Sequence, residues 1–93
     1  MKSIKTTRFF FHTRWIFWTD WGARPRIERA GFDGSHRSTI VEESVRWPNG
    51  VTIDLTQDRI FWVDAKLNLV GSADLDGANS RWVLGDISSI AIG

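Results

Sequence analysis

Short apolar runs, each ended by a cluster of turn-forming residues, are the dominant pattern along this chain. Residues 51–55 (VTIDL) alternate apolar and polar side chains with a period of two, which is typical of a strand that buries one face. Residues 15–20 and 59–64 are short, aromatic and β-branched, as expected of strands covered on both faces. No stretch shows a long 3.6-residue period, so we predict an all-β chain with essentially no helix. The predicted strands cover residues 15–20, 26–32, 37–42, 51–55, 59–64, 68–75, 80–84 and 87–92.

Glycine-containing turns separate these strands. Asp33-Gly34 and Asp76-Gly77 predict hairpin reversals, because glycine adopts the positive φ that a tight reversal needs. Residues 48–50 (PNG) predict a turn immediately before the strand at 51–55.

The sequence repeats itself with a period of about 44 residues. IFWTD at residues 16–20 returns as IFWVD at 60–64, and IERAGFDG at 27–34 aligns with VGSADLDG at 70–77. A period near 44 fits the β-propeller class, in which four-stranded blades recur at about 40–45 residues. Residues 51–84 then form a full four-stranded blade, whereas residues 15–50 form a partial blade of three strands with its connecting turn.

Both ends of the chain lie outside the repeat. Residues 1–14 have no counterpart in the second unit, and residues 85–93 are a possible first strand of a third blade. Phe9–Phe11 are either a strand that completes the first blade or a non-native sequence that promotes aggregation. Repeats of this kind need about three or more copies to bury their faces, so we expect neighbouring blades to be required. A piece of a larger propeller and a truncated gene product both fit this pattern.

Five motifs carry a family resemblance. FWTDWG, RIERAGFDGS, RWPNGVTID, RIFWVDAKLN and ADLDG, in this order and spacing, resemble the YWTD, or LDL-receptor class B, repeat. The runs IERAG and WPNG are most similar to the first propeller of the arrow-like Wnt co-receptor branch of the LDL-receptor-related proteins. The resemblance implies a six-bladed β-propeller, of which this chain would supply about two four-stranded antiparallel blades.

The resemblance also implies a function. Propellers of this family are non-enzymatic modules on the extracellular face of the plasma membrane, within single-pass receptors that bind secreted protein ligands. For the Wnt co-receptor branch these ligands are Wnt proteins or Wnt antagonists. The alternatives are an endocytic lipoprotein-receptor-type propeller, a non-functional truncated fragment and, as the weakest, a propeller hydrolase. No Ser/His/Asp or phosphate-loop signature supports the hydrolase.

The motif residues themselves suggest structural roles. We expect Trp18 and Trp62 to pack between blades, since buried aromatic side chains dominate core energetics. Asp20 and Asp64 end their strands, and a buried carboxylate must be paired, so we expect each to accept hydrogen bonds from backbone N–H groups. The chain has no tyrosine, and phenylalanine occupies both positions of the motif tyrosine. The structural motif set is Phe17, Trp18, Asp20, Phe61, Trp62, Asp64, Asp33, Gly34, Asp76 and Gly77.

Four loop residues are the candidate ligand-binding set: Trp21, Trp47, Asn49 and Lys66. Tryptophan is enriched among the residues that dominate protein recognition, and loops at strand ends carry the binding surfaces of rigid scaffolds. In the alternative interpretation Trp47 packs on Pro48, and Asn49 only serves the turn. By resemblance, Trp47 and Asn49 fall where co-receptor propellers meet the Asn-x-Ile loop of antagonists, with Trp21 and Lys66 on the same face.

Composition and charge exclude several classes of function. The net charge of +1 gives no basis for a nucleic-acid binder. The absence of cysteine excludes a disulfide framework or a cysteine zinc site in this sequence, and we predict no metal or cofactor. The longest apolar runs are four residues, against about 18 for a membrane span, and we find no signal peptide, so any membrane anchor would lie outside this chain. The arginines of the first unit predict a solvated basic rim or a patch for an acidic ligand: Arg24, Arg26, Arg29 and Arg37.

Overall fold

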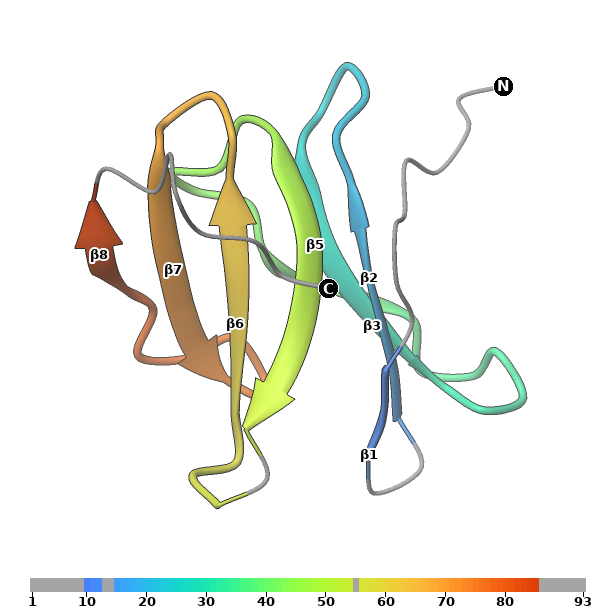
Figure 1. Cartoon of the computed structure of the whole chain (residues 1–93). Coiled ribbons are helices and arrows are strands. Elements are labelled where there is room, and N and C mark those ends of the chain that lie inside the picture. Colours follow the sequence, from blue (N-terminus) through green and yellow to red (C-terminus); the bar gives the residue numbers. More distant parts are fainter. Residues whose placement is uncertain (1–9, 13–14, 55, 86–93) are drawn as a thin grey trace.

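The structure, a computed structural model, describes residues 10–12, 15–54 and 56–85 and consists of two four-stranded antiparallel sheets (Figure 1). In each sheet the strands follow chain order. No helix occurs within the described residues, and the predicted all-β class is confirmed. The first sheet contains β1 (Phe10–His12), β2 (Trp15–Asp20), β3 (Arg26–Gly31) and β4 (Ser38–Val41). The second contains β5 (Pro48–Asp54), β6 (Arg59–Asp64), β7 (Leu69–Asp74) and β8 (Arg81–Gly85).

The first sheet has a fourth strand before the three predicted within residues 15–50. β1 pairs with β2 in antiparallel register, with Phe10 opposite Phe17 and His12 opposite Trp15. Of the two alternatives for Phe9–Phe11, the structure therefore supports the strand that completes the first blade. A three-residue run is too short to show a period. The predicted strand at 87–92 lies outside the described residues.

The segment at residues 48–50 is also different from its prediction. It belongs to β5, and the β5–β6 register shifts between Pro48 and Val51. Gly50 takes a φ of 125° there. The motif is therefore a bulge within the strand, which bends β5 where it enters the sheet, and not a turn that precedes it.

The two sheets share an irregularity that supports the repeat alignment. The β3–β4 register shifts between Ile27 and Glu28, and the β7–β8 register shifts between Val70 and Gly71. These positions are equivalent in the two repeats. The same bulge in the outer strand pair shows that both units fold in one register.

The two Asp-Gly turns lie in longer loops than a two-residue hairpin. Gly34 and Gly77 have φ values of 85° and 92°, in the left-handed region that favours glycine. The Asp33 carboxylate accepts a hydrogen bond from the Ser35 N–H at 2.9 Å, and the Asp76 carboxylate accepts one from the Ala78 N–H at 3.0 Å. Each aspartate thus closes its loop locally.

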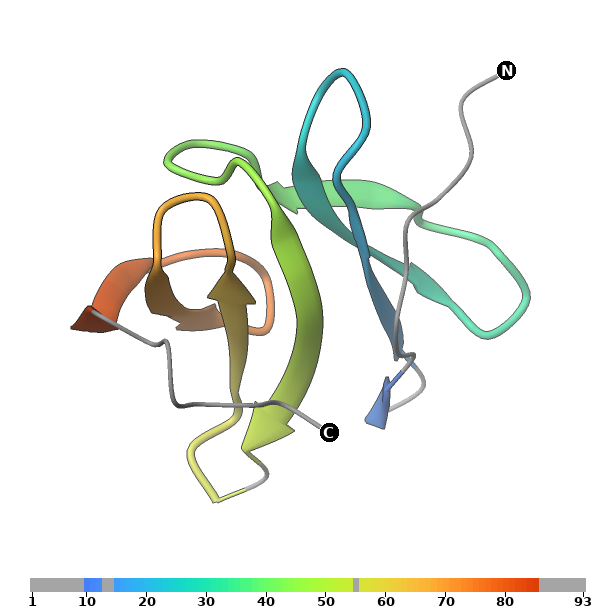
Figure 2. The same cartoon turned by 45° about the horizontal axis from the view of Figure 1, so that its top comes forward.

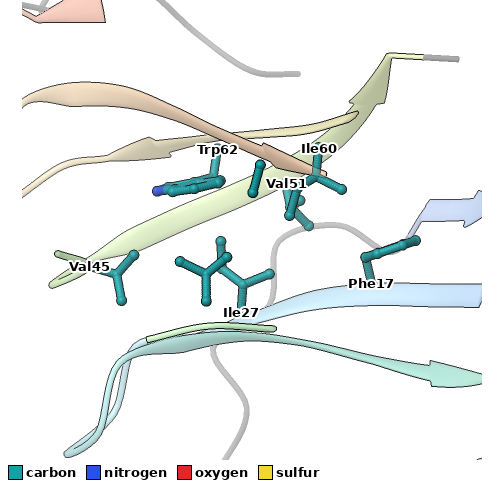
Figure 3. Close-up of a cluster of buried hydrophobic side chains, with 8 residues drawn as sticks. Phe17, Ile27, Val45, Val51, Ile60 and Trp62 are labelled. Atoms are coloured by element: carbon teal, nitrogen blue, oxygen red, sulfur yellow. The ribbon is translucent and has the colours of Figure 1, made fainter. Parts of the chain in front are cut away.

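The hydrophobic core lies between the two sheets (Figure 3). Because side chains alternate across a sheet, Phe17 and Trp18 project to opposite faces, as do Phe61 and Trp62. The first sheet contributes its Phe17 face and the second sheet its Trp62 face, so the sheets stack in one direction, like successive blades. Trp62 packs between the sheets as expected, whereas Trp18 is buried on the far face of the first sheet. The core cluster is Phe17, Ile27, Val41, Val45, Val51, Ile60, Trp62 and Ala73.

The turn at residues 75–77 of the second repeat also contacts the first sheet. Nη1 of Arg29 donates a hydrogen bond to the carbonyl oxygen of Leu75 at 3.0 Å. A Cβ built on Gly77 would overlap the carbonyl oxygen of Ile40 in β4. Glycine is therefore required at position 77 by the close approach of β4 as well as by its φ.

The connection from β4 to β5 carries the chain from the last strand of one sheet to the first strand of the next. β5 runs beside β2 (Figures 1 and 2). The loops at residues 21–25, 42–47 and 65–68 consequently gather at one end of the two sheets, the upper end in Figure 1.

Candidate functional site

Three of the four predicted binding residues meet at this loop end. The rings of Trp21 and Trp47 lie with their centroids 6.2 Å apart and their planes at 53°, a tilted aromatic pair. Nζ of Lys66 lies 5.2 Å from the centroid of the Trp47 ring, within the range of a cation–π contact. Trp21 is 36% exposed and Trp47 is 45% exposed. The two rings and the cation form a surface that is open to solvent and built from three separate loops.

Asn49 lies near this surface but is not part of the ring contact. It is exposed and stands in β5, two residues after Trp47. Its φ is not in the left-handed region, because Gly50 takes the positive φ of the bulge. The structure therefore gives Asn49 no special role as a turn residue.

Asp64 organises the two loops that carry Trp47 and Lys66. Its carboxylate is fully buried at the end of β6. One oxygen accepts backbone N–H groups from Trp47 at 3.3 Å, Lys66 at 3.1 Å and Leu67 at 2.8 Å. The other accepts the N–H of Arg46 at 2.7 Å. Four backbone donors compensate the buried charge, as expected from its position, and fix the two loops relative to each other.

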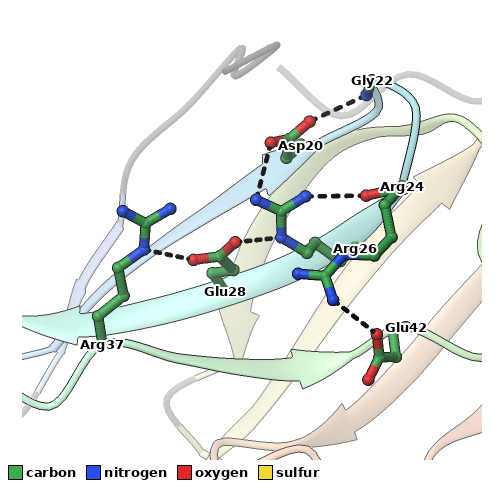
Figure 4. A network of polar contacts seen from close by, with 7 residues as sticks. All are labelled: Asp20, Gly22, Arg24, Arg26, Glu28, Arg37 and Glu42. Carbon is green, nitrogen blue, oxygen red and sulfur yellow. Dashed lines mark hydrogen bonds and ion pairs between the residues drawn. The ribbon is translucent and has the colours of Figure 1, made fainter. Parts of the chain in front are cut away.

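Asp20, the equivalent residue of the first repeat, holds the loop that carries Trp21 (Figure 4). It accepts the Gly22 N–H at 2.9 Å and forms an ion pair with Nη2 of Arg26 at 3.1 Å. Arg26 also pairs with Glu28 and donates to the carbonyl oxygen of Arg24 at 2.9 Å. The prediction of a solvated rim was wrong for Arg26, which is buried among these partners.

Glu28 is the second carboxylate of this network. Burial raises its pKa, but the hydrogen bonds and positive charges of Arg37 and Arg26 outweigh burial and lower the pKa below the ordinary 4.5. The guanidinium of Arg37 also lies 5.6 Å from the centroid of the Trp18 ring. The carboxylate therefore stays ionised at neutral pH and joins the two arginines.

Leu67 is a member of the loop surface that sequence reasoning missed. It is an exposed large apolar side chain that follows Lys66 in the loop between β6 and β7. Its signal in the sequence was its place in the DAKLN motif, directly after a predicted site residue.

Within residues 10–12, 15–54 and 56–85, no three acidic or histidine side chains form a group that could hold a metal ion. In the same part of the chain no helix is long and apolar enough to cross a membrane.

Comparison with known proteins agrees with this architecture. The family model of the low-density lipoprotein receptor repeat class B matches residues 14–55. The vitellogenin receptor Yl of Drosophila melanogaster is 51% identical over 69 residues, which is 74% of this chain and 4% of that protein. The vitellogenin receptor of Solenopsis invicta is 44% identical over 72 residues, which is 77% of this chain and 4% of that protein.

Two further similarities extend the comparison. The human low-density lipoprotein receptor-related protein 5-like protein is 34% identical over 70 residues, covering 75% of this chain and 28% of that protein. Among solved structures, a chain of the nidogen/laminin complex superposes with a TM-score of 0.69 at 28% identity, covering 85% of this chain and 28% of that chain. The chain thus spans only a small part of each of these proteins.

Proposed function

The chain carries low-density lipoprotein receptor class B repeats, and from that premise we propose that it forms part of a ligand-binding propeller in an extracellular receptor. Its relatives include membrane receptors, which supports an extracellular location. The ligand in this proposal is a secreted protein.

The observation that carries the proposal is the surface formed by Trp21, Trp47 and Lys66. Tryptophan supplies a large contact area at low entropic cost, and few exposed side chains contribute more to protein recognition. Here both rings are fixed before any ligand arrives, because Asp64 and the Asp20–Arg26 pair hold their loops. A preorganised surface loses less conformational entropy on binding. The cation of Lys66 beside Trp47 favours a ligand that presents a carboxylate or a carbonyl group next to an apolar side chain.

Vitellogenin is the ligand that the similarities favour. The two relatives with the highest identity among those described above are named as vitellogenin receptors. Such a receptor corresponds to the alternative predicted from the motifs, an endocytic lipoprotein-receptor-type propeller.

A Wnt co-receptor is the second candidate. It is supported by the 34% identity to the human receptor-related protein 5-like protein and by the resemblance of the WPNG motif. In that case Trp47 and Asn49 would contact the Asn-x-Ile loop of an antagonist.

The experiment measures binding by the receptor ectodomain in which this proposal places the chain. Immobilised ectodomain is titrated with vitellogenin and, separately, with an Asn-x-Ile antagonist peptide. We expect Trp47→Ala to weaken binding of the true ligand by about 30-fold or more, as for an exposed tryptophan at the centre of an interface. Trp82→Ala is the matched control, since Trp82 is a 63% exposed tryptophan on β8 that is not one of the three side chains of the proposed surface.

The two candidates differ in Asn49. If the chain belongs to a Wnt co-receptor, Asn49→Ala should weaken peptide binding more than Asn68→Ala does. Asn68 is the comparison because it lies in the loop between β6 and β7 and is not a predicted ligand contact. Equal effects of the two substitutions would remove Asn49 from the site. If Trp47→Ala and Trp82→Ala weaken the binding of each ligand to the same extent, the surface formed by Trp21, Trp47 and Lys66 is not the binding site.

A further inference from the structure

The motif tryptophans of the two sheets differ in what covers their rings. In the first sheet Trp18 stands opposite Glu28 of β3, and Glu28 stands opposite Thr39 of β4. Directly paired residues project to the same face of a sheet, so these three side chains form a row. Cζ of Arg37 lies 5.6 Å from the centroid of the Trp18 ring, and its Nε donates a hydrogen bond to Glu28 at 2.7 Å. An arginine of the chain itself therefore lies over this tryptophan.

The second sheet has the equivalent row but lacks the arginine. Trp62 stands opposite Gly71, and Gly71 stands opposite Trp82. In the repeat alignment Ser80 takes the place of the arginine, and Gly71 takes the place of the carboxylate. The guanidinium and its acidic partner are thus both missing beside Trp62.

A pocket of about 220 Å³ lies beside this second row, between β8 and the connection from β4 to β5. It is smaller than the sites of drug-sized ligands, which occupy about 300–1,000 Å³, and it has room for one side chain. Nε1 has no hydrogen-bond partner in either motif tryptophan within the part of the chain that the structure describes, so the contrast lies in what covers the rings. The lining residues are Glu43, Ser44, Trp62, Ser80, Arg81 and Trp82.

Glu43 supplies a carboxylate to this pocket. It is exposed, and no hydrogen bond or ion pair joins its side chain to another residue within the described ranges. The adjacent Glu42 does not line the pocket and forms an ion pair with Arg24 at 3.7 Å. A carboxylate beside a tryptophan ring is the combination that holds Arg37 in the first sheet. In the second sheet the carboxylate comes from the connection between the sheets, and its place for a cation is open.

We propose that this pocket binds an arginine side chain of a partner protein, with the guanidinium against the Trp62 ring and the Glu43 carboxylate. Arginine suits the pocket better than lysine, because its planar guanidinium stacks on aromatic rings and pairs with carboxylates at the same time. None of Trp21, Trp47 and Lys66 lines the pocket. The site is therefore separate from the loop surface, and its partner is a protein other than the ligand proposed above. Either proposal can fail without the other.

Titration of the full 93-residue chain with N-acetyl-arginine amide, followed by NMR of the indole N–H groups, tests the proposal. We expect the Trp62 resonance to shift and to saturate at millimolar concentrations, since a single side chain makes few contacts. N-acetyl-citrulline amide is the matched probe, because it has nearly the same shape without the charge, and it should bind about fivefold more weakly or less. Equal binding of the two probes, or a Trp62 resonance that does not move, would overturn the proposal.

Two substitutions test the residues of the pocket. Glu43→Gln should weaken arginine binding about fivefold, because it removes the charge and keeps the shape. Ser80→Arg should weaken it by a similar factor, because it places an arginine of the chain where the first repeat has Arg37. Glu42→Gln is the control, since it removes the same charge from the adjacent residue, which does not line the pocket. The dispersion of each NMR spectrum verifies the fold, and equal effects of Glu43→Gln and Glu42→Gln, or a Ser80→Arg chain that binds as the parent does, would refute the assignment.

Arg81 tests the sign of the charge that the pocket accepts. Its positive charge opposes an incoming guanidinium, so Arg81→Gln should tighten binding of the arginine probe about two- to threefold. A pocket for carboxylates would behave in the opposite way. Tighter binding of N-acetyl-glutamate amide than of the arginine probe, lost on Arg81→Gln, would show that the pocket takes an anion and that the proposal is wrong.

Discussion

The two repeats place the same tryptophan in different surroundings. In the second repeat the Trp62 ring lies directly on Gly71, where a Cβ would overlap Cζ2 and Cε2 of the ring. The first repeat has Glu28 at the position of Gly71, so its Cβ prevents Trp18 from lying in the same place. Trp18 lies beneath the guanidinium of Arg37 instead, and Glu28 binds two arginines. The same motif tryptophan therefore packs on a glycine in the second sheet and beneath an arginine in the first.

The motif aspartates differ in the same way. Asp64 is satisfied by four backbone N–H groups from two loops, whereas within the described part of the chain Asp20 has one backbone donor and one guanidinium. The second repeat therefore fixes its loops with hydrogen bonds to the main chain. The first repeat depends on a buried network of charges, in which each member needs its partners.

The largest expected effect is that of Gly71→Ala. The added methyl group would overlap the buried Trp62 ring, so we expect a loss of about 3–5 kcal/mol in the free energy of unfolding. Urea denaturation of the chain measures it, with the exposed Ser80→Ala as the control. Combining Gly71→Ala with Trp62→Leu, a smaller side chain, should recover part of the loss. A loss below about 1 kcal/mol would show that the ring is not held against Gly71.

The next effect compares the two aspartates. Asp64→Asn replaces an acceptor of four N–H groups by a side chain that presents its own N–H donors, and should cost about 2–4 kcal/mol of unfolding free energy. Asp20→Asn should cost less, about 1–2 kcal/mol, because Glu28 still compensates Arg26. Denaturation of the two variants at the same pH gives the comparison. Equal losses would mean that the backbone donors around Asp64 contribute no more than a single ion pair.

A smaller difference is expected between the two glycine turns. Gly34→Ala and Gly77→Ala introduce the same strain of a left-handed alanine, about 1–2 kcal/mol. Only Gly77→Ala also meets the β4 backbone, so it should destabilise the chain by about 1–3 kcal/mol more. Urea denaturation of the two variants under the same conditions isolates this difference. Equal effects would show that β4 can move away from the turn without cost.

The sequence predicted the structural features that both repeats share, but not those that occur in only one of them. The period, the strand positions and the buried Asp64 followed from matched motifs, because each copy confirmed the other. The sequence offered β1 only as one of two alternatives, since it has no matching motif in the second repeat. The network around Arg26 and Glu28 was missed because four arginines in one unit are typical of a solvated surface. The pairing of β2 with β3 brings Asp20 beside Arg26, and the segment after β3 brings Arg37 to Glu28. The meeting of Trp21 with Trp47 likewise depends on how the two sheets stack.

The smallest expected effect is a pH dependence of the free energy of unfolding that comes from the charged network of the first repeat. The arginines lower the pKa of Glu28 in the folded chain, so its ionised form stabilises the fold above the unfolded pKa of about 4.5. That contribution is lost as the pH falls through the lower, folded pKa. Glu28→Gln should therefore be less stable than the parent chain at pH 7, and the gap in free energy of unfolding should narrow towards pH 3. Asp54→Asn is the control for a carboxylate held by neutral side chains, whose pKa is lowered mainly by hydrogen bonds from Thr56. If the gap for Glu28→Gln is the same at pH 3 and pH 7, the charge of Glu28 does not hold the first sheet together, and its role there is one of shape alone.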